Sequence, residues 1–168
     1  MKFLEYKRIE EPPKVDKFEM YSLYKALYKT HFSITKKRNI MTSILGREKW
    51  SWRVVGITKE AIKKIIEYNY KVSVKKELQR DHYFQGRNQT YSEIFDKFHS
   101  FDDWWKKVWE NDRTILMTKL EHSLKKNVQI YDLDWTLGLF QCAKQVGFEY
   151  TQGREGYYIN KNYSSKIK

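Results

Sequence analysis

Hydrophobic positions recur at helical spacing along most of the chain. In Phe18–Lys29, for example, Tyr21, Tyr24 and Leu27 fall on one face of a helix. Several later stretches open with a Ser or Thr whose side chain can accept a hydrogen bond from a backbone N–H of the first turn. The predicted helices are Phe18–Lys29, Thr35–Gly46, Thr58–Asn69, Thr90 onward, Ser100–Asn111, Thr118 onward and Leu133–Val146.

Shorter stretches follow a strand pattern. Lys71–Arg80 alternates in part and contains valines, and Thr114–Met117 is an apolar run of strand length. Trp50–Val55 is either a short strand or the entry to the next helix. Phe148–Thr151 and Gly156–Ile159 are separated by a short polar segment with a glycine, which predicts a C-terminal β-hairpin.

The order of these elements predicts a mostly helical α+β fold in one domain, 1–168. Met1–Lys17 carries both prolines and is expected to be an irregular arm. Within the domain we expect a basic helical part at 18–70 and a small ββα unit with a helical insertion at 74–126. Residues 130–160 are expected to form a helix followed by the hairpin.

Charge narrows the class of partner. The chain has 33 Lys and Arg against 21 Asp and Glu, a net charge of +12, and a surplus of this size favours a polyanion such as nucleic acid. The excess is strongest between Lys25 and Arg53, with eight basic residues and one acid. In this stretch Lys36, Lys37 and Arg38 are predicted to contact phosphates, and a solvated helix face is the alternative.

The same composition excludes other classes. A single cysteine, Cys142, is incompatible with an intramolecular disulfide framework or a zinc site built from several cysteines. The chain has no apolar run of roughly 18 residues, and Met1–Glu5 does not lead into a secretory signal. We therefore expect a cytoplasmic protein, in a bacterial or phage-infected cell, with no membrane partner.

Two of the four histidines lie where phosphodiester chemistry could use them. His82 follows Asp81 at the end of an extended segment, and His122 lies in the first turn of a helix directly after a strand. Phosphodiester hydrolysis needs a base for water, a divalent cation and positive side chains that hold the strand. If Asp81 and His122 bind one metal ion, most of its coordination positions are left to water and phosphate oxygens, which suits Mg²⁺. His31 and His99 have no such neighbours and are expected to be structural or exposed.

At these residues the chain resembles the HNH branch of the ββα-metal nucleases. The matching segments are Leu78–His82, which ends in the Asp-His pair, and Asn111–His122, a strand followed by the helix with the last histidine. The resemblance implies His82 as the general base. It implies Asp81 and His122 as ligands of Mg²⁺ or another divalent cation. It also implies an asparagine that orients the base through its backbone or side chain.

Two further positions follow from the resemblance. Asn111 lies further from the last histidine than the family pattern prefers, and Asp112 or Arg113 falls nearer to the expected place of the asparagine. Asn111 and Arg113 are the candidate catalytic residues. Arg80 and Arg87 flank the Asp-His pair and are expected to contact the phosphate backbone.

The expected function is therefore a metal-dependent DNA endonuclease in which His82 activates water, and RNA is the alternative substrate, because net charge does not separate DNA from RNA. If this is right, the metal-facing atoms of Asp81 and His122 lie within about 3 to 5 Å of each other. The alternative is a non-catalytic nucleic-acid-binding phage accessory protein, which would use the net charge without hydrolysis.

Overall fold

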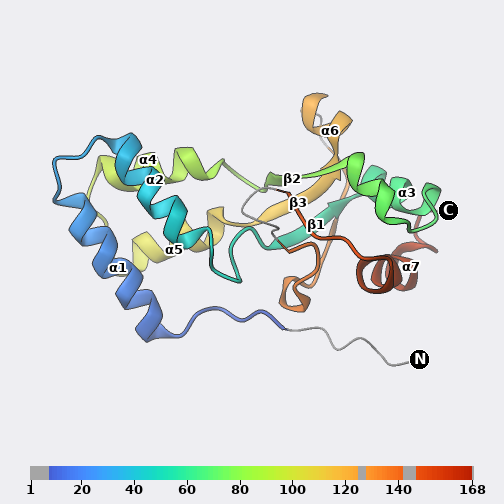
Figure 1. Ribbon diagram of the computed structural model, residues 1–168, viewed down its shortest axis with the longest axis horizontal. Coiled ribbons are helices and arrows are strands. Elements are labelled where there is room, and N and C mark those ends of the chain that lie inside the picture. Colours follow the sequence, from blue (N-terminus) through green and yellow to red (C-terminus); the bar gives the residue numbers. More distant parts are fainter. Residues whose placement is uncertain (1–7, 125–127, 142–146, 168) are drawn as a thin grey trace. The chain divides into compact units, whose positions relative to one another are not determined.

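The computed structural model describes residues 8–124, 128–141 and 147–167 (Figure 1). Contacts within the chain form two compact units. The sheet unit comprises Met1–Ile9, Arg53–Asp81 and Thr114–Lys168, and the helical unit comprises Glu10–Trp52 and His82–Arg113. Neither unit is a continuous stretch of sequence, because the chain passes between them at four points.

A mixed four-stranded sheet organises the sheet unit. Its central strand β1 (Val54–Thr58) runs parallel to β3 (Thr114–Thr118) and antiparallel to β4 (Ile130–Asp132). β2 (Leu78–His82) lies on the other side of β3, so the strand order is β2-β3-β1-β4. The predicted strand at Thr114–Met117 is thus confirmed.

Two backbone hydrogen bonds define the direction of β2 relative to β3. Lys119 N–H donates to the Glu77 carbonyl, and Tyr83 N–H donates to the Arg113 carbonyl. Residue numbers rise on one strand as they fall on the other, so β2 and β3 are antiparallel. α6 (Lys119–Leu124) follows β3 directly, which completes the order strand, antiparallel strand, helix.

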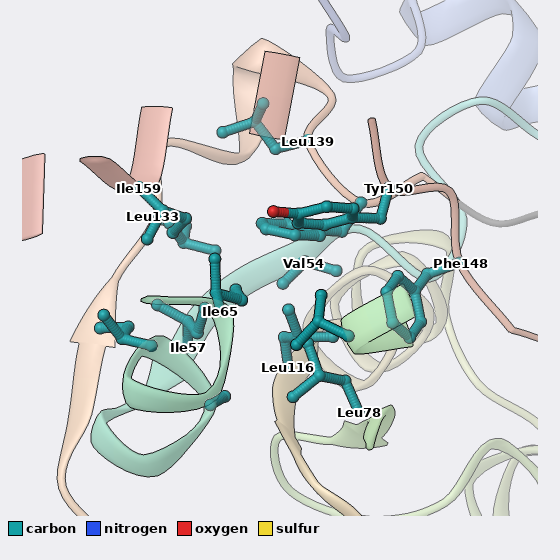
Figure 2. Close-up of a cluster of buried hydrophobic side chains, with 14 of the residues drawn as sticks. Val54, Ile57, Ile65, Leu78, Leu116, Leu133, Leu139, Phe148, Tyr150 and Ile159 are labelled. Atoms are coloured by element: carbon teal, nitrogen blue, oxygen red, sulfur yellow. The ribbon is translucent and has the colours of Figure 1, made fainter. Parts of the chain in front are cut away.

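The core of the sheet unit is apolar and lies between the sheet and two helices. α3 (Lys59–Glu67) starts where β1 ends, with Thr58 Oγ1 accepting from Ala61 N–H as the predicted N-cap. α7 (Tyr157–Tyr163) packs on α3. The core residues, most of which are drawn in Figure 2, are Val54, Ile57, Ala61, Ile62, Ile65, Val74, Leu78, Leu116, Leu133, Leu139, Phe140, Phe148, Tyr150, Ile159 and Tyr163.

Four helices build the helical unit around aromatic side chains. They are α1 (Lys14–Tyr28), α2 (Ile34–Leu45), α4 (Arg87–Asp96) and α5 (Phe101–Asn111). The rings of Tyr24 and Trp104 are fully buried and stack with centroids 5.6 Å apart. The Tyr24 hydroxyl donates to the Ile94 carbonyl, so its polar end is also satisfied.

These elements confirm the predicted α+β class and most of the predicted helices. Tyr21, Tyr24 and Leu27 are buried on α1 as expected, although α1 begins at Lys14, inside the predicted arm. Ser100 caps α5 through a hydrogen bond from Asp103 N–H. The described residues contain no helix long and apolar enough to cross a membrane.

The predicted helix start at Thr90 is wrong. α4 begins one turn earlier, at Arg87, with Gly86 as its N-cap residue. Thr90 is therefore inside the helix, where its hydroxyl bonds back to the Gly86 carbonyl. A second difference lies in Lys71–Arg80, where Val72–Lys76 forms a 3₁₀-helix before β2 begins.

The C-terminal hairpin is also wrong. Gln152–Gly156 forms a π-helical turn that runs directly into α7. Glu155 is fully buried there, and its carboxylate accepts from the backbone N–H groups of Phe140 and Thr151. These bonds satisfy a buried charge and fix a helical turn in place of a β-turn.

The predicted helix Leu133–Val146 is not present in its described part. That stretch follows β4 and contains a short 3₁₀-helix, Trp135–Leu137, which ends at Gly138 in the left-handed conformation. The remainder of the prediction, including Cys142, lies outside the described residues.

Candidate functional site

Asp81 and His122 meet in the sheet unit although 40 residues separate them in the sequence. Asp81 Oδ2 lies 3.7 Å from His122 Nε2. The two side chains are 41% and 46% exposed, respectively, so both can be reached by solvent. This separation falls within the range expected for two ligands of one metal ion.

The pair is positioned by the antiparallel strands and the helix that follows them. The hydrogen bonds at the two ends of β2 and β3 share one register, which places Asp81 opposite Ile115. α6 then carries His122 back to Asp81. Each ligand candidate therefore sits on a regular element, which limits the movement of its side chain.

The first turn of α6 is held by Glu121. Its Oε2 accepts from Thr118 N–H at 2.9 Å, and Glu121 N–H donates to Thr118 Oγ1, which is the predicted capping box. The same Oε2 accepts from the Thr58 hydroxyl at 2.8 Å. Glu121 thus ties α6 to the ends of both parallel strands, β1 and β3.

The chemistry of the Asp81–His122 pair fits a hard divalent cation. A carboxylate oxygen and a neutral imidazole nitrogen both offer lone pairs, and two adjacent ligands of an octahedral Mg²⁺ lie about 3.0 Å apart. The 3.7 Å separation requires only a small side-chain movement. Among the described residues no group of three or more His, Cys, Asp or Glu could hold a metal ion.

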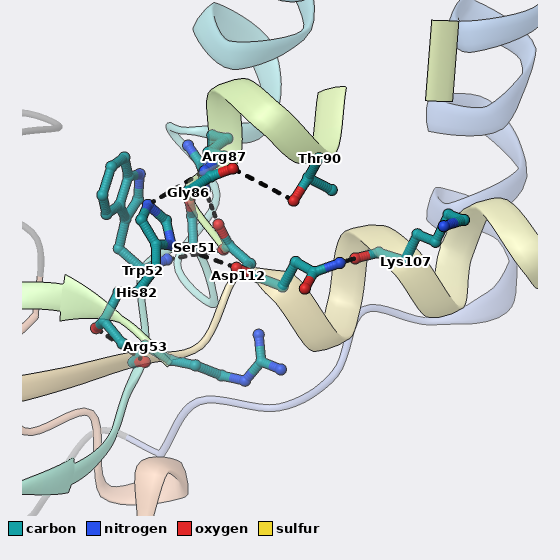
Figure 3. A network of polar contacts seen from close by, with 11 residues as sticks. Ser51, Trp52, Arg53, His82, Gly86, Arg87, Thr90, Lys107 and Asp112 are labelled. Atoms are coloured by element: carbon teal, nitrogen blue, oxygen red, sulfur yellow. Dashed lines mark hydrogen bonds and ion pairs between the residues drawn. The ribbon is translucent and has the colours of Figure 1, made fainter. Parts of the chain in front are cut away.

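His82, the next residue after Asp81, is held within the helical unit on several sides (Figure 3). Its Nε2 accepts from Arg87 N–H at 3.4 Å, and its Nδ1 lies 3.3 Å from the Asn111 carbonyl. The Trp52 ring lies against the imidazole, with centroids 4.7 Å apart. Because Nε2 accepts, a neutral His82 carries its proton on Nδ1 and donates it to Asn111.

Asn111 acts on His82 through its backbone. Its side chain is used elsewhere, since Nδ2 donates to the Lys107 carbonyl one turn earlier in α5. Arg113 also lies in the helical unit, where its Nε donates to the Glu110 carbonyl and its guanidinium lies over the ring of Phe84.

Arg87 is not a surface residue, which corrects its predicted phosphate contact. It is 5% exposed and forms an ion pair with Asp112, itself buried (Figure 3). Its guanidinium also donates to Ser51 and lies 4.5 Å from the centre of the Trp52 ring. A buried cation needs such partners, so Arg87 is a structural residue of the helical unit.

The basic residues predicted to contact phosphates on α2 also differ in their exposure to solvent. Lys37 is 8% exposed, and its Nζ donates to the Tyr28 carbonyl, which corrects its predicted phosphate contact. Lys36 is exposed, and Arg38 and Arg80 are half-buried. Lys36, Arg38 and Arg80 are the predicted basic contacts that retain exposed surface.

The contacts of three residues of the site could not be predicted from the sequence. Asp112, considered from the sequence only as a substitute for the family's asparagine, pairs with Arg87, and Trp52 contacts Arg87 and His82. Both lie far from these partners in the chain, so no local pattern signals the contacts. Glu121 was identified as a helix cap, but its bond to Thr58 depends on the pairing of β1 with β3.

Comparisons of the chain with protein-family models, with curated proteins and with solved structures find no match.

Proposed function

We propose that the protein is a divalent-metal-dependent endonuclease of the HNH type that hydrolyses phosphodiester bonds in DNA. The observation that carries the proposal is the approach of Asp81 to His122, 3.7 Å apart on a strand–strand–helix arrangement. A carboxylate and an imidazole brought together across 40 residues, both partly exposed, form a ligand pair that the resemblance anticipates.

The roles follow from the chemistry of each group. Asp81 and His122 would hold the cation, which when bound offsets charge on the scissile phosphate and the leaving oxygen. His82 would take a proton from water through Nε2, while Nδ1–H donates to the Asn111 carbonyl. The water oxygen then bonds to phosphorus, the P–O bond to the leaving oxygen breaks, and that oxygen takes a proton from solvent.

The distribution of charge supports nucleic acid as the substrate. The sheet unit has 19 Lys and Arg against 10 Asp and Glu, and the helical unit has 14 against 11. Most of the net charge of +12 therefore belongs to the unit that contains Asp81 and His122. Phosphate neutralisation by such residues supplies most of the affinity in non-specific binding.

A nicking assay tests the proposal. Wild-type protein is incubated with supercoiled plasmid and Mg²⁺ or Mn²⁺, and a parallel sample contains EDTA. We expect metal-dependent nicking by the wild type. The nicking rate should be about 10²- to 10⁴-fold lower in His82→Ala, and nicking should be lost in Asp81→Asn and His122→Ala. His31→Ala and Asp96→Asn, two exposed positions of the same residue types, serve as matched controls.

One observation favours a second candidate, a non-catalytic nucleic-acid-binding protein. His82 Nε2, the nitrogen that a base must leave open to water, accepts from Arg87 N–H at 3.4 Å. If the wild type binds DNA and RNA but cleaves neither with any divalent metal, the endonuclease proposal fails and this candidate replaces it. Equal nicking by the wild type and all three site variants would indicate a contaminating nuclease and reject the assigned site.

A further inference from the structure

Two aromatic side chains directly after β2 are exposed on the helical unit. Tyr83 is 40% exposed and Phe84 is 61% exposed, with their rings in edge contact at 4.8 Å between centroids. A phenylalanine ring left largely in water forgoes most of the free energy that its burial would release. Packing within the unit therefore does not account for the position of Phe84.

Arg113 holds these two rings in place. Its guanidinium carbon lies 5.4 Å from the centre of the Tyr83 ring and 4.8 Å from the centre of the Phe84 ring. Arg113 is itself fixed, because its Nε donates to the Glu110 carbonyl and its own carbonyl accepts from Tyr83 N–H, both at 2.9 Å. We call Tyr83, Phe84 and Arg113 the aromatic cluster.

We infer that the aromatic cluster stacks against the base of an unpaired nucleotide. The inference rests on the proposed function, because it takes nucleic acid as the ligand. Exposed rings offer the flat apolar surface on which a base stacks, and an arginine beside them adds a cation for the base or its phosphate. The cluster begins one residue after His82, so it and the proposed base belong to the same unit of the chain.

This cluster indicates which nucleic acids are preferred. In a duplex each base face is covered by its neighbours, whereas an unpaired base can place its face on an aromatic side chain. Substrates with a single-stranded or locally unpaired segment should therefore bind more tightly than uniform duplex. The preference should depend on the base and not on the phosphate alone.

Binding measurements with three oligonucleotides test the inference. A labelled single strand, its duplex and the same strand with abasic sites are titrated by fluorescence anisotropy. The protein carries His82→Ala and the buffer contains EDTA, so that no cleavage occurs. Phe84→Ala should weaken binding of the intact strand by roughly tenfold and leave the duplex and the abasic strand nearly unchanged. Phe84→Trp should retain the affinity, because indole stacks as well as phenyl.

Tyr157→Ala is the matched control, since this ring is 47% exposed on the sheet unit and should not affect any of the three ligands. An equal loss on the intact and abasic strands, or no loss at all, overturns the inference and leaves the endonuclease proposal standing. Base-dependent binding without cleavage by the wild type would support the inference and reject the endonuclease. If none of the three ligands binds, both fail.

Discussion

At the scale of single residues, His82 is oriented by the main chain. The carbonyl of Asn111 and the N–H of Arg87 bond to its two ring nitrogens, and of all substitutions only proline at position 87 would remove one of these groups. Trp52, whose ring is tilted against the imidazole, contacts His82 through its own side chain. Orientation by backbone groups is tolerant of sequence change, because every residue supplies the carbonyl and every residue except proline supplies the N–H.

Because Asn111 acts through its backbone, we expect alanine substitution to affect nicking activity much less at Asn111 than at His82. The nicking rate of Asn111→Ala should stay within about threefold of the wild-type rate, because the carbonyl that orients His82 remains. The nicking rate of His82→Ala should be about 10²- to 10⁴-fold lower than that of the wild type. Initial rates of plasmid nicking measure both. A folded Asn111→Ala protein that is as inactive as His82→Ala would show that the amide side chain itself acts in the reaction.

At the scale of secondary-structure elements, α6 matters because it is short and carries His122. It has six residues and no buried side chain, so its position depends on the capping box and on the bond from Thr58 to Glu121. Loss of Glu121 leaves the Thr118 N–H and the Thr58 hydroxyl without this acceptor. The first turn of α6 then loses these hydrogen bonds, and the position of His122 becomes less fixed.

We therefore expect Glu121→Ala to lower the free energy of unfolding by about 1 to 2 kcal/mol. The Mg²⁺ concentration needed for half-maximal nicking should rise by about tenfold, since Glu121 positions the helix that carries the proposed ligand His122. Urea denaturation and a metal titration provide the two readouts. Glu60→Gln, in the first turn of α3 and bonded to exposed Lys63, is the control. An unchanged metal requirement in a destabilised Glu121→Ala protein would show that α6 does not depend on this bond.

Elements that depend on local signals could be predicted from the sequence. Ser100, Thr58 and Thr118 each cap the helix that the sequence places after them, because a cap involves only three or four neighbouring residues. The C-terminal region could not be predicted in this way. The buried carboxylate of Glu155 bonds to Phe140, 15 residues earlier, and stabilises a turn whose own residues alternate like a hairpin.

In the candidate site, too, features that depend on local sequence could be predicted and features that depend on distant residues could not. Asp81 and His122 could be predicted as a pair from the strand and helix that carry them. The burial of Arg87 could not, because its partner Asp112 lies 25 residues away and an arginine in a polar stretch is more often exposed. The burial of Lys37 was missed for a similar reason, since it depends on the packing of α2 beside Tyr28.

At the scale of the whole molecule, both units bury tyrosines whose ionisation opposes folding. Burial raises the pKa of Tyr24 in the helical unit to about 12. Burial likewise raises the pKa of Tyr91 in that unit and of Tyr150 and Tyr163 in the sheet unit. The unfolded chain releases these protons near pH 10, while the folded protein retains them.

The contribution of these tyrosines to the free energy of unfolding should therefore be constant below about pH 10. It should fall as the pH rises from there towards the pKa values that the tyrosines have in the folded protein. Each tyrosine contributes a slope of at most about 1.4 kcal/mol per pH unit. Urea denaturation at a series of pH values measures the fall, and Tyr24→Phe should make it shallower. A free energy of unfolding that stays level through pH 11 would contradict the assignment.

The network around Arg87 has a consequence for genetics. Trp52, His82 and Asp112 lie in this one network, and each lies at or next to a point where the chain enters or leaves the helical unit. A screen for inactive alleles would therefore recover Arg87 and Asp112 beside His82, although the two are buried and remote from solvent. Temperature sensitivity would distinguish them, because alleles that break a buried ion pair fail on warming, whereas an allele that removes the proposed base should fail at every temperature.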